Sequence, residues 1–360
     1  MCAVKVREVA RDLSLSPATV SKAINGKPGQ VSLDTARTVL KHCYKHGYMS
    51  KTEADRILYK MSAMNSAKQV FVVTHFHGVL VYDTVFAGIC EELQNNDMYP
   101  SSFLVHDEGS MLRFPYEKAG CVIIIGRVIP KALDELSNNG VPVVLVDNRI
   151  AGSGASAINT NNMDAVSESV QILAGIGHKR IAFLCNHQDK KAFTYTFHQR
   201  QIGYMAGMAA AGLPIDKELM IVIEGSDYDN EDFDWEKCRQ DLRDLGRKIL
   251  EVDPLPTAVV AANDMIAYLL REVLQENGIK VPDDITIVGY DGLHRLSIEK
   301  TGYQPLSTQV VDWRKLGREA VGLALDLLCD PQQGPKYIEV PTVYEDAGTV
   351  AAPRKELITF

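Results

Sequence analysis

Residues 16–25 combine small hydroxyl side chains, an amide and a single cation within one predicted helix. Hydrophobic spacing places Val20, Ala23 and Ile24 on its inner face. A lysine ammonium can donate to N7 and O6 of guanine, an alanine methyl can contact the thymine methyl, and a proline offers apolar contact only. An outer face with few large apolar groups therefore suits a helix that lies in the major groove of DNA. The outer residues are Pro17, Ala18, Ser21, Lys22 and Asn25.

Two further short helices are predicted on either side of this segment. The first covers residues 6–13, where apolar residues recur at helical spacing. The central helix starts at Ser16 and Pro17, because a hydroxyl can cap free backbone N–H groups and a proline lacks the N–H that would otherwise stay unpaired. The third helix starts after Ser32 and stops at Gly47. Three short helices with a tight first turn follow the helix-turn-helix plan, although a small helical scaffold without a nucleic-acid role is the alternative.

Charge is distributed unevenly along the chain. Residues 1–62 hold eleven Lys or Arg against five Asp or Glu, a net charge of +6. Because the whole chain carries −8, the remainder carries −14. A basic head on an acidic body favours contact between DNA and the head alone, since the body would repel a polyanion.

The composition indicates a folded chain with more than one structural unit. A length of 360 residues with 46% hydrophobic side chains exceeds the roughly 250–300 residues at which single cores stop growing. No apolar run approaches the ~20 residues of a spanning helix, so no membrane contact is expected. The N-terminal segment is charged every few residues and lacks the apolar stretch of a secretory signal, so we expect a cytoplasmic protein. The seven cysteines include no CxxC pair and are expected to be reduced thiols.

No pattern typical of an enzyme stands in the sequence. It has no phosphate-binding P-loop, no dinucleotide fingerprint and no GxSxG nucleophile elbow. His75 and His77 share one strand face, but no third ligand stands at a useful spacing, so no metal is expected. We therefore expect neither catalysis nor a cofactor.

From residue 69 onward, short apolar runs alternate with amphipathic helical segments. The runs cover residues 70–73, 122–125, 143–146, 181–184, 258–261 and 285–288. Such runs, separated by helices, predict parallel sheets built from βαβ units. A body of about 290 residues exceeds one typical doubly wound unit, which favours two similar lobes with a cleft between them.

Four short motifs stand in the N-terminal segment. They are VA at residues 9–10, SPATVSKAIN at residues 16–25, VS at residues 31–32 and GY at residues 47–48. Together they resemble the DNA-binding head of the lactose-repressor (LacI/GalR) family. The resemblance implies that Pro17, Ala18 and Lys22 face base edges. It further implies that the helix is positioned on phosphates by Ser16, Thr19, Ser21 and Asn25.

Residues 49–67 form a helix-prone linker without a core of its own. In the family this segment is a hinge helix that folds when two copies meet in the minor groove, where an apolar side chain from each opens the central base step. By this resemblance Ile57 is the wedge, with Leu58 as the alternative. Ser50 stands near the position of a family proline. An ordinary flexible linker is the other possibility.

The resemblance continues through the body. GHKRIA at residues 177–182, RQIGY at 200–204, AND at 262–264 and VGYD at 288–291 are similar to signatures of the same family. They imply the periplasmic sugar-binding fold, in which a ligand lies between two lobes joined by three crossovers. By this resemblance the crossovers fall near residues 147–154, 292–303 and 328–341.

Several polar side chains follow predicted strands of the body. Arg200 offers a fork of hydrogen-bond donors, whereas Asp147 and Asp291 can accept from paired hydroxyls. Asn263 can do both. Groups of this kind suit a sugar-like effector. The expected effector-binding residues also include Tyr82, Asp83 and Asp227.

Structural roles are the alternative for several of these positions. Asp264 can cap the helix that follows it, Asp147 can tie a crossover, and Tyr82 can belong to a subunit interface. The chain also departs from the family at residues 310–313, where VVDW stands in place of a segment that often carries a glutamine near the ligand.

These observations predict an α/β protein with three parts. An all-α helix-turn-helix head covers residues 1–48, and a hinge helix or linker covers residues 49–67. A two-lobed, periplasmic-binding-protein-like body of two doubly wound parallel sheets covers residues 68–360. Its expected role is effector binding and dimerisation.

The expected function is that of a transcriptional repressor. Its partners would be double-stranded, pseudo-palindromic DNA and a small sugar or sugar derivative. We expect a homodimer, because twofold symmetry matches a pseudo-palindrome and residues 354–360 lack the heptads of the family's tetramers. The alternatives are a DNA-binding regulator with a protein or non-sugar effector, and a cytoplasmic sugar-binding protein.

Overall fold

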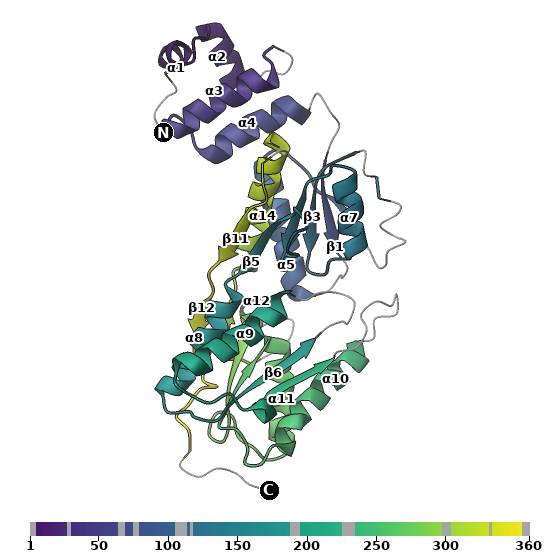
Figure 1. The fold of residues 1–360 in the computed structure, drawn as a ribbon, viewed down its shortest axis with the longest axis vertical. Helices are drawn as coiled ribbons and strands as arrows, with labels where there is room; N and C mark the ends of the chain where they lie inside the picture. Colours follow the sequence, from purple (N-terminus) through teal and green to yellow (C-terminus); the bar gives the residue numbers. More distant parts are fainter. Residues whose placement is uncertain are drawn as a thin grey trace.

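The chain folds into a helical head and two α/β lobes that follow one another along the long axis of the molecule (Figure 1). The computed structural model describes residues 5–26, 30–63, 69–74, 79–104, 114–115, 118–187, 195–224, 235–296, 304–330 and 333–354. The six cysteines within these ranges are free thiols.

The head consists of α1 (Val6–Asp12), α2 (Pro17–Ile24) and α3 (Leu33–Lys45). Each of the last two helices starts where the sequence places a serine. The Ser16 hydroxyl accepts from the N–H of Thr19 at 3.0 Å, and the Ser32 hydroxyl accepts from that of Thr35 at 3.2 Å. The helices enclose a small core of Val9, Val20, Ala23, Ala36, Val39 and Cys43, all buried.

Helix α4 (Lys51–Ala63) follows the head and packs on it rather than standing apart. Ala54, Leu58 and Met61 are buried together with the core of the head. In Figure 1 α4 lies between α3 and the first lobe. The head and this segment are therefore one packed unit in the structure.

The first lobe is built on a six-stranded parallel sheet. Its strands in spatial order are β11 (Tyr337–Val340), β5 (Ser156–Thr160), β4 (Val143–Val146), β3 (Ala119–Ile125), β1 (Gln69–Thr74) and β2 (Ser101–Leu104). Helix α7 (Pro130–Asn138) covers one face. Helices α5 (Leu80–Asn95) and α14 (Trp313–Cys329) pack together on the other.

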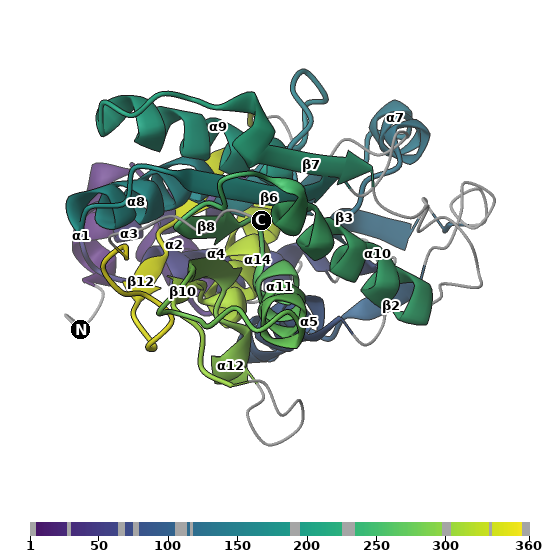
Figure 2. The ribbon, with the colours of Figure 1, turned by 90° about the horizontal axis from the view of Figure 1, so that it is seen from below.

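The described residues of the second lobe form a six-stranded sheet, in which β10 pairs antiparallel with β12 and the other pairings are parallel. Its strands in spatial order are β12 (Val343–Glu345), β10 (Thr308–Val310), β9 (Thr286–Asp291), β8 (Ala258–Ala261), β6 (Ile181–His187) and β7 (Met220–Glu224). Helices lie on either side of this sheet (Figure 2). These are α8 (Asn162–Gly175) with α9 (Tyr195–Ala210), and α10 (Trp235–Arg247) with α11 (Asp264–Glu276). Three shorter turns complete the lobe: α12 (Leu293–Leu296) and the 3-10 turns Lys217–Leu219 and Lys248–Glu251.

The chain passes between the lobes at three places, and two of the predicted positions are wrong. Residues 147–154 connect β4 to β5 within one sheet, and residues 292–303 lie between β9 and β10, which are also neighbours. The passages instead follow β5, β10 and β11, near residues 161, 311 and 341. The passage after β11, near residue 341, falls at the end of the third predicted range, 328–341. Strands β5 and β10 carry too few apolar residues to form a recognisable run, which is why the sequence pattern misses them.

Two glycines allow α5 and α14 to cross closely. A Cβ added at Gly88 would lie less than 3.0 Å from backbone atoms of Arg314, and one added at Gly317 less than 3.0 Å from the Val85 carbonyl. Real Cβ atoms essentially never come this near to backbone. The helix pair can therefore not separate or slide without losing this fit.

Replacing Gly317 by alanine should lower the free energy of unfolding by about 1–3 kcal/mol, because the added methyl would overpack the crossing. Urea denaturation followed by circular dichroism measures the change. Gly322→Ala on the same helix is the control, since nothing lies within 4 Å of its added Cβ. That control should stabilise the helix by up to about 1 kcal/mol. Equal responses of the two variants would contradict the close crossing.

Candidate functional site

The seven predicted DNA-contacting positions of residues 16–25 lie together on the outer side of α2 and at its two ends. Ser16, Pro17, Ala18, Lys22 and Asn25 are exposed, and Thr19 and Ser21 are half-buried. Val20 and Ala23 point to the core from the opposite side. The hydroxyls are ordered locally: Ser16 Oγ and Thr19 Oγ1 are 2.8 Å apart, and Asn25 Nδ2 donates to Ser21 Oγ at 3.2 Å. The face is thus polar, small and open.

Ile57, the predicted wedge, is half-buried on α4 and faces the end of α2. A Cβ added at Gly26 would lie 3.2 Å from Ile57 Cγ2. Leu58, the alternative wedge, is buried in the core of the head. An insertion by either side chain into a base step requires α4 to leave this packing.

The head and α4 touch the end of α14 through charged groups. The Lys51 ammonium pairs with the Asp326 carboxylate, and the Arg37 guanidinium donates to the backbone carbonyl of Cys329. Lys336, at the start of β11, also pairs with Asp326 at 2.5 Å. Sequence reasoning misses this junction, because residues almost 300 positions apart share no motif or periodicity.

Residues from both lobes form a polar cluster, defined as Tyr82, Asp147, Arg200, Tyr290 and Asp291 and called the buried polar cluster. Tyr82 is half-buried and the other four are buried. Tyr82 and Asp147 come from α5 and the end of β4 in the first lobe; Arg200, Tyr290 and Asp291 come from α9 and β9 in the second. A hydroxyl contact joins the lobes beside it, since Tyr290 Oη and Thr160 Oγ1 are 2.6 Å apart.

Arg200 is the centre of this cluster and only 3% exposed. Its Nε donates to Asn162 Oδ1 and its Nη1 to the carbonyl of Ala262, each at 2.7 Å. Nη1 also lies 3.6 Å from Asp291 Oδ1, and the guanidinium stacks 3.7 Å from the centre of the Tyr290 ring. The charge is therefore held by a carboxylate, two oxygen acceptors and an aromatic face.

Asp147 and Asp291 each end a strand in an unusual backbone conformation, with φ of +58° and +120°. Such conformations are uncommon for residues with a side chain and cluster at functional sites. Burial raises the pKa of Asp147 to about 6, against the opposing effects of Arg200 and of the hydrogen bond from Tyr82. Burial also raises the pKa of Asp291 well above its usual range, although Arg200 lowers it.

The structure distributes the remaining predicted effector residues differently. Asn263 is the N-cap of α11, its Oδ1 accepting from the N–H of Ile266 at 2.9 Å. Asp264 is fully buried and accepts from the Thr308 hydroxyl at 2.6 Å and the Leu293 N–H at 2.8 Å, so the alternative that it caps the helix is wrong. Asp83 is exposed, one residue beyond Tyr82.

Two of the predicted groups lie outside the described residues: Asp227, and the pair His75 and His77. Within the part of the chain that the structure describes, no three His, Cys, Asp or Glu side chains come together as a metal site would require.

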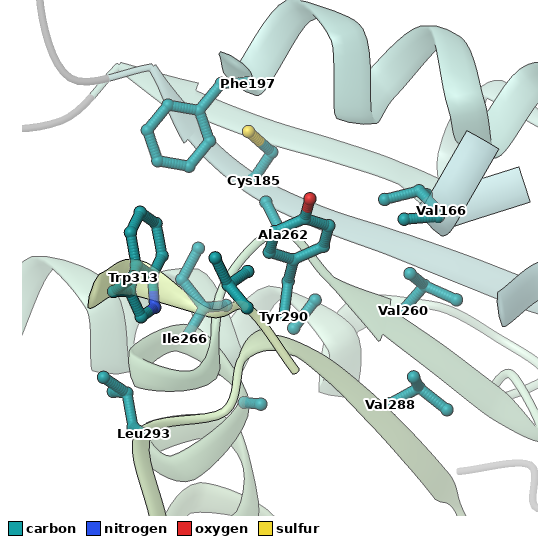
Figure 3. Packing of buried hydrophobic residues seen from close by; sticks show 14 of the residues in the cluster. Val166, Cys185, Phe197, Val260, Ala262, Ile266, Val288, Tyr290, Leu293 and Trp313 are labelled. Carbon is teal, nitrogen blue, oxygen red and sulfur yellow. The ribbon is translucent and has the colours of Figure 1, made fainter. Parts of the chain in front are cut away.

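Aromatic residues next to the cluster were not predicted as site residues. Trp313, the first residue of α14, is 2% exposed and its indole N–H donates to the backbone carbonyl of Asp291 at 3.0 Å. Trp313, Phe197, Tyr290 and Cys185 belong to one packed cluster, and in the view of Figure 3 Cys185 lies between Phe197 and Tyr290. Gly126 makes room for Tyr82, whose ring end lies within 2.9 Å of where a Cβ would stand. The VVDW departure at residues 310–313 was the available signal for Trp313.

Comparison with known proteins agrees with this architecture. Residues 170–346 match the periplasmic binding protein-like domain family. Catabolite control protein A of Priestia megaterium is 27% identical over 314 residues, covering 86% of this chain and 87% of that protein. The transcriptional repressor PurR of Vibrio parahaemolyticus is 27% identical over 345 residues, 93% of this chain and 95% of the relative. These relatives and the matched domain support the resemblance to the LacI/GalR family of transcriptional regulators.

Solved structures of similar transcriptional regulators share the fold of this chain. A LacI family regulator from Enterococcus faecium with bound ribose superposes with a TM-score of 0.65 at 20% identity, covering 80% of this chain and all of that one. A CelR–cellobiose complex covers 96% of this chain and all of that one, with a TM-score of 0.62 at 21% identity. The predicted fold class, a helical head with two largely parallel sheets, is confirmed. No helix among the described residues is long and apolar enough to cross a membrane.

The raised pKa of Asp147 has a consequence for stability. The folded protein holds this proton more tightly than the unfolded chain does, so the stability that Asp147 contributes is full below its ordinary pKa of 3.8 and is lost as the pH rises through about 6. Between about pH 5 and about pH 7, the unfolding free energy of the wild type relative to Asp147→Asn should fall by roughly 1 kcal/mol. Urea titrations of both proteins at the two pH values measure this. A difference independent of pH would contradict the assignment.

Proposed function

We propose that the chain is a homodimeric repressor that reads a pseudo-palindromic operator through α2 and whose operator affinity depends on a small sugar-like effector bound at the buried polar cluster. One observation carries this proposal. The buried polar cluster gathers buried charged side chains from both lobes at strand ends, where α/β proteins bind ligands. The same chain carries an open, small-residue helix face within residues 1–62, a segment of net charge +6.

The relatives support each half of the proposal. The curated proteins are named as a control protein and as helix-turn-helix repressors. Two structural neighbours hold ribose and cellobiose, which favours a carbohydrate over a protein effector. We assign residues 1–48 to DNA binding, 49–67 to the hinge and 68–360 to effector binding and dimerisation, and we place the protein in the cytoplasm with its operator. A homodimer follows from the symmetry of a pseudo-palindrome.

Helix α14 is the proposed route by which the two sites communicate. Its first residue, Trp313, is bonded to Asp291 in the cluster, and its last turn holds Lys51 through Asp326 and Arg37 through Cys329. The glycine crossing with α5 fixes the helix laterally. A ligand that shifts Trp313 would therefore move the junction with the head, and the free energy of DNA binding with it.

Lys22→Ala should weaken operator binding by about 5–150-fold, because a lysine that donates to guanine is worth roughly 1–3 kcal/mol of discrimination. Fluorescence anisotropy with duplexes from the chain's own upstream region, at one fixed salt concentration, measures it. Lys131→Ala on α7 removes the same charge from an exposed position of the body and serves as control. If the two variants bind alike, α2 does not read the operator.

Asp326→Asn should reduce the factor by which a sugar changes operator affinity, while the affinity for the sugar itself stays the same. The reason is that the substitution breaks the pair with Lys51 but lies at the far end of α14 from the cluster. Operator titrations with and without saturating sugar give this factor. Asp330→Asn, an exposed carboxylate just past the same helix end, is the matched control. A coupling factor that survives Asp326→Asn would rule out α14 as the route.

A further inference from the structure

A glutamine side chain is completely buried near one of the passages between the lobes. Gln309 lies in β10, just before the passage near residue 311, and is 0% exposed. Its Oε1 accepts from the Thr342 hydroxyl at 2.8 Å, and its Nε2 donates to Glu168 Oε2 and to Ser169 Oγ, each at 3.1 Å. Both ends of the amide therefore have the partners that a buried polar group requires.

The hydroxyl partner of Gln309 lies in a second passage and is bonded to the remaining one. Thr342 is in the passage that follows β11, and its backbone N–H donates to Asn161 Oδ1 at 2.9 Å. Asn161 is in the passage after β5, and its own N–H donates to the Val340 carbonyl at 3.3 Å. One series of hydrogen bonds thus connects all three passages. We name its three members, Asn161, Gln309 and Thr342, the interlobe clip.

The interlobe clip is anchored to the second lobe and adjoins the buried polar cluster. Both acceptors of Gln309 Nε2 belong to α8, so the amide attaches the clip to that helix. Asn162, which follows Asn161 in the chain, is 2% exposed and accepts from Arg200 Nε at 2.7 Å. In the passage after β5, one asparagine therefore belongs to the clip and the next is bonded to the cation of the cluster.

The interlobe clip resists any shift of the three passages relative to one another. A rotation of one lobe against the other changes backbone angles in the passages. When the passages shift, the bond between Thr342 and Gln309 has to break, and the glutamine is too deeply buried for water to replace the lost donor readily. A satisfied polar network also requires particular directions, whereas an apolar side chain of the same size would only fill the space.

We propose that Gln309 and Thr342 are positioning residues that restrict the two lobes of the free protein to one relative orientation, and that a change of orientation has to open the hydrogen bond between them. This inference concerns the passages between the lobes and does not depend on which effector or operator the chain binds. A ligand that reorients the lobes must also supply the free energy that opens this bond.

Double electron–electron resonance on the full-length chain, without DNA or sugar, tests the proposal. Spin labels are attached to p-acetylphenylalanine in place of Asp134 on α7 and Lys248 in the second lobe, two exposed positions that report on the distance between the lobes. An excess of unlabelled chain ensures that distances within one chain are measured. The unsubstituted clip should give one narrow distance distribution. A broad distribution would overturn the proposal, because the lobes would then not be restricted.

Two substitutions open the interlobe clip in the same labelled chain. Gln309→Met keeps the length of the side chain and removes the amide, and Thr342→Val keeps the shape and removes the hydroxyl donor. Each should raise the population outside the main distance by about 2–10-fold, the change expected from the loss of one hydrogen bond. Gln171→Met is the matched control, since this glutamine is exposed on α8 and its amide donates to Ser167 within the helix. The control should leave the distribution unchanged.

Thermal melts by circular dichroism check that the variants are folded, and either folded variant decides alone. A distribution equal to that of the unsubstituted chain overturns the positioning role. Hydrogen exchange of the wild-type chain gives a second measurement that needs no substitution. The amide of Thr342, which donates to Asn161, should exchange at least about tenfold more slowly than an open amide. Exchange at the open rate would also overturn the proposal.

Discussion

The arrangement of strand ends in the second lobe depends on the need to compensate one buried guanidinium, that of Arg200. Arg200 is 3% exposed, and an unpaired charge at that depth would cost several kcal/mol. The structure compensates by converging three elements on it: the start of α8 through Asn162, the end of β8 through Ala262 and the end of β9 through Asp291. The ends of these strands are therefore held in one arrangement, and Asp291 is forced into a backbone conformation that residues other than glycine rarely adopt.

Hydrogen bonds and ion pairs connect this site to the first lobe and to the head. The carbonyl of Asp291 accepts from Trp313, which begins the longest described helix, and the last turn of that helix contacts the head. The first lobe contributes Tyr82 and Asp147 to the cluster, and its Thr160 hydroxyl contacts the Tyr290 hydroxyl of the second lobe. A ligand at the cluster thus meets groups from both lobes and from the helix that reaches the head.

Much of this arrangement is predictable from the sequence, because it depends on local rules. The serine caps of α2 and α3 and the spacing of Val20 and Ala23 suffice to predict the helices of the head. Apolar runs predict most strands, and Arg200, Asp147 and Asp291 were expected near a ligand. The crossovers were misplaced because β5 and β10 are short and polar. Lys51 and Asp326 meet only through tertiary structure, and nothing in local sequence indicates that Asn263 rather than Asp264 caps α11.

The central claim is that ligand binding at the buried polar cluster and operator binding by the head are thermodynamically coupled. Linkage requires reciprocity: if a sugar changes operator affinity by some factor, the operator must change the sugar's affinity by the same factor. Trp313 and Trp235 are the two tryptophans of the chain, so a Trp235→Phe protein reports on the cluster by Trp313 fluorescence alone. Titrating it with cellobiose, ribose or glucosamine, in the absence and presence of saturating operator duplex, should give sugar affinities that differ by about fivefold or more. Identical affinities in the two titrations would contradict the account.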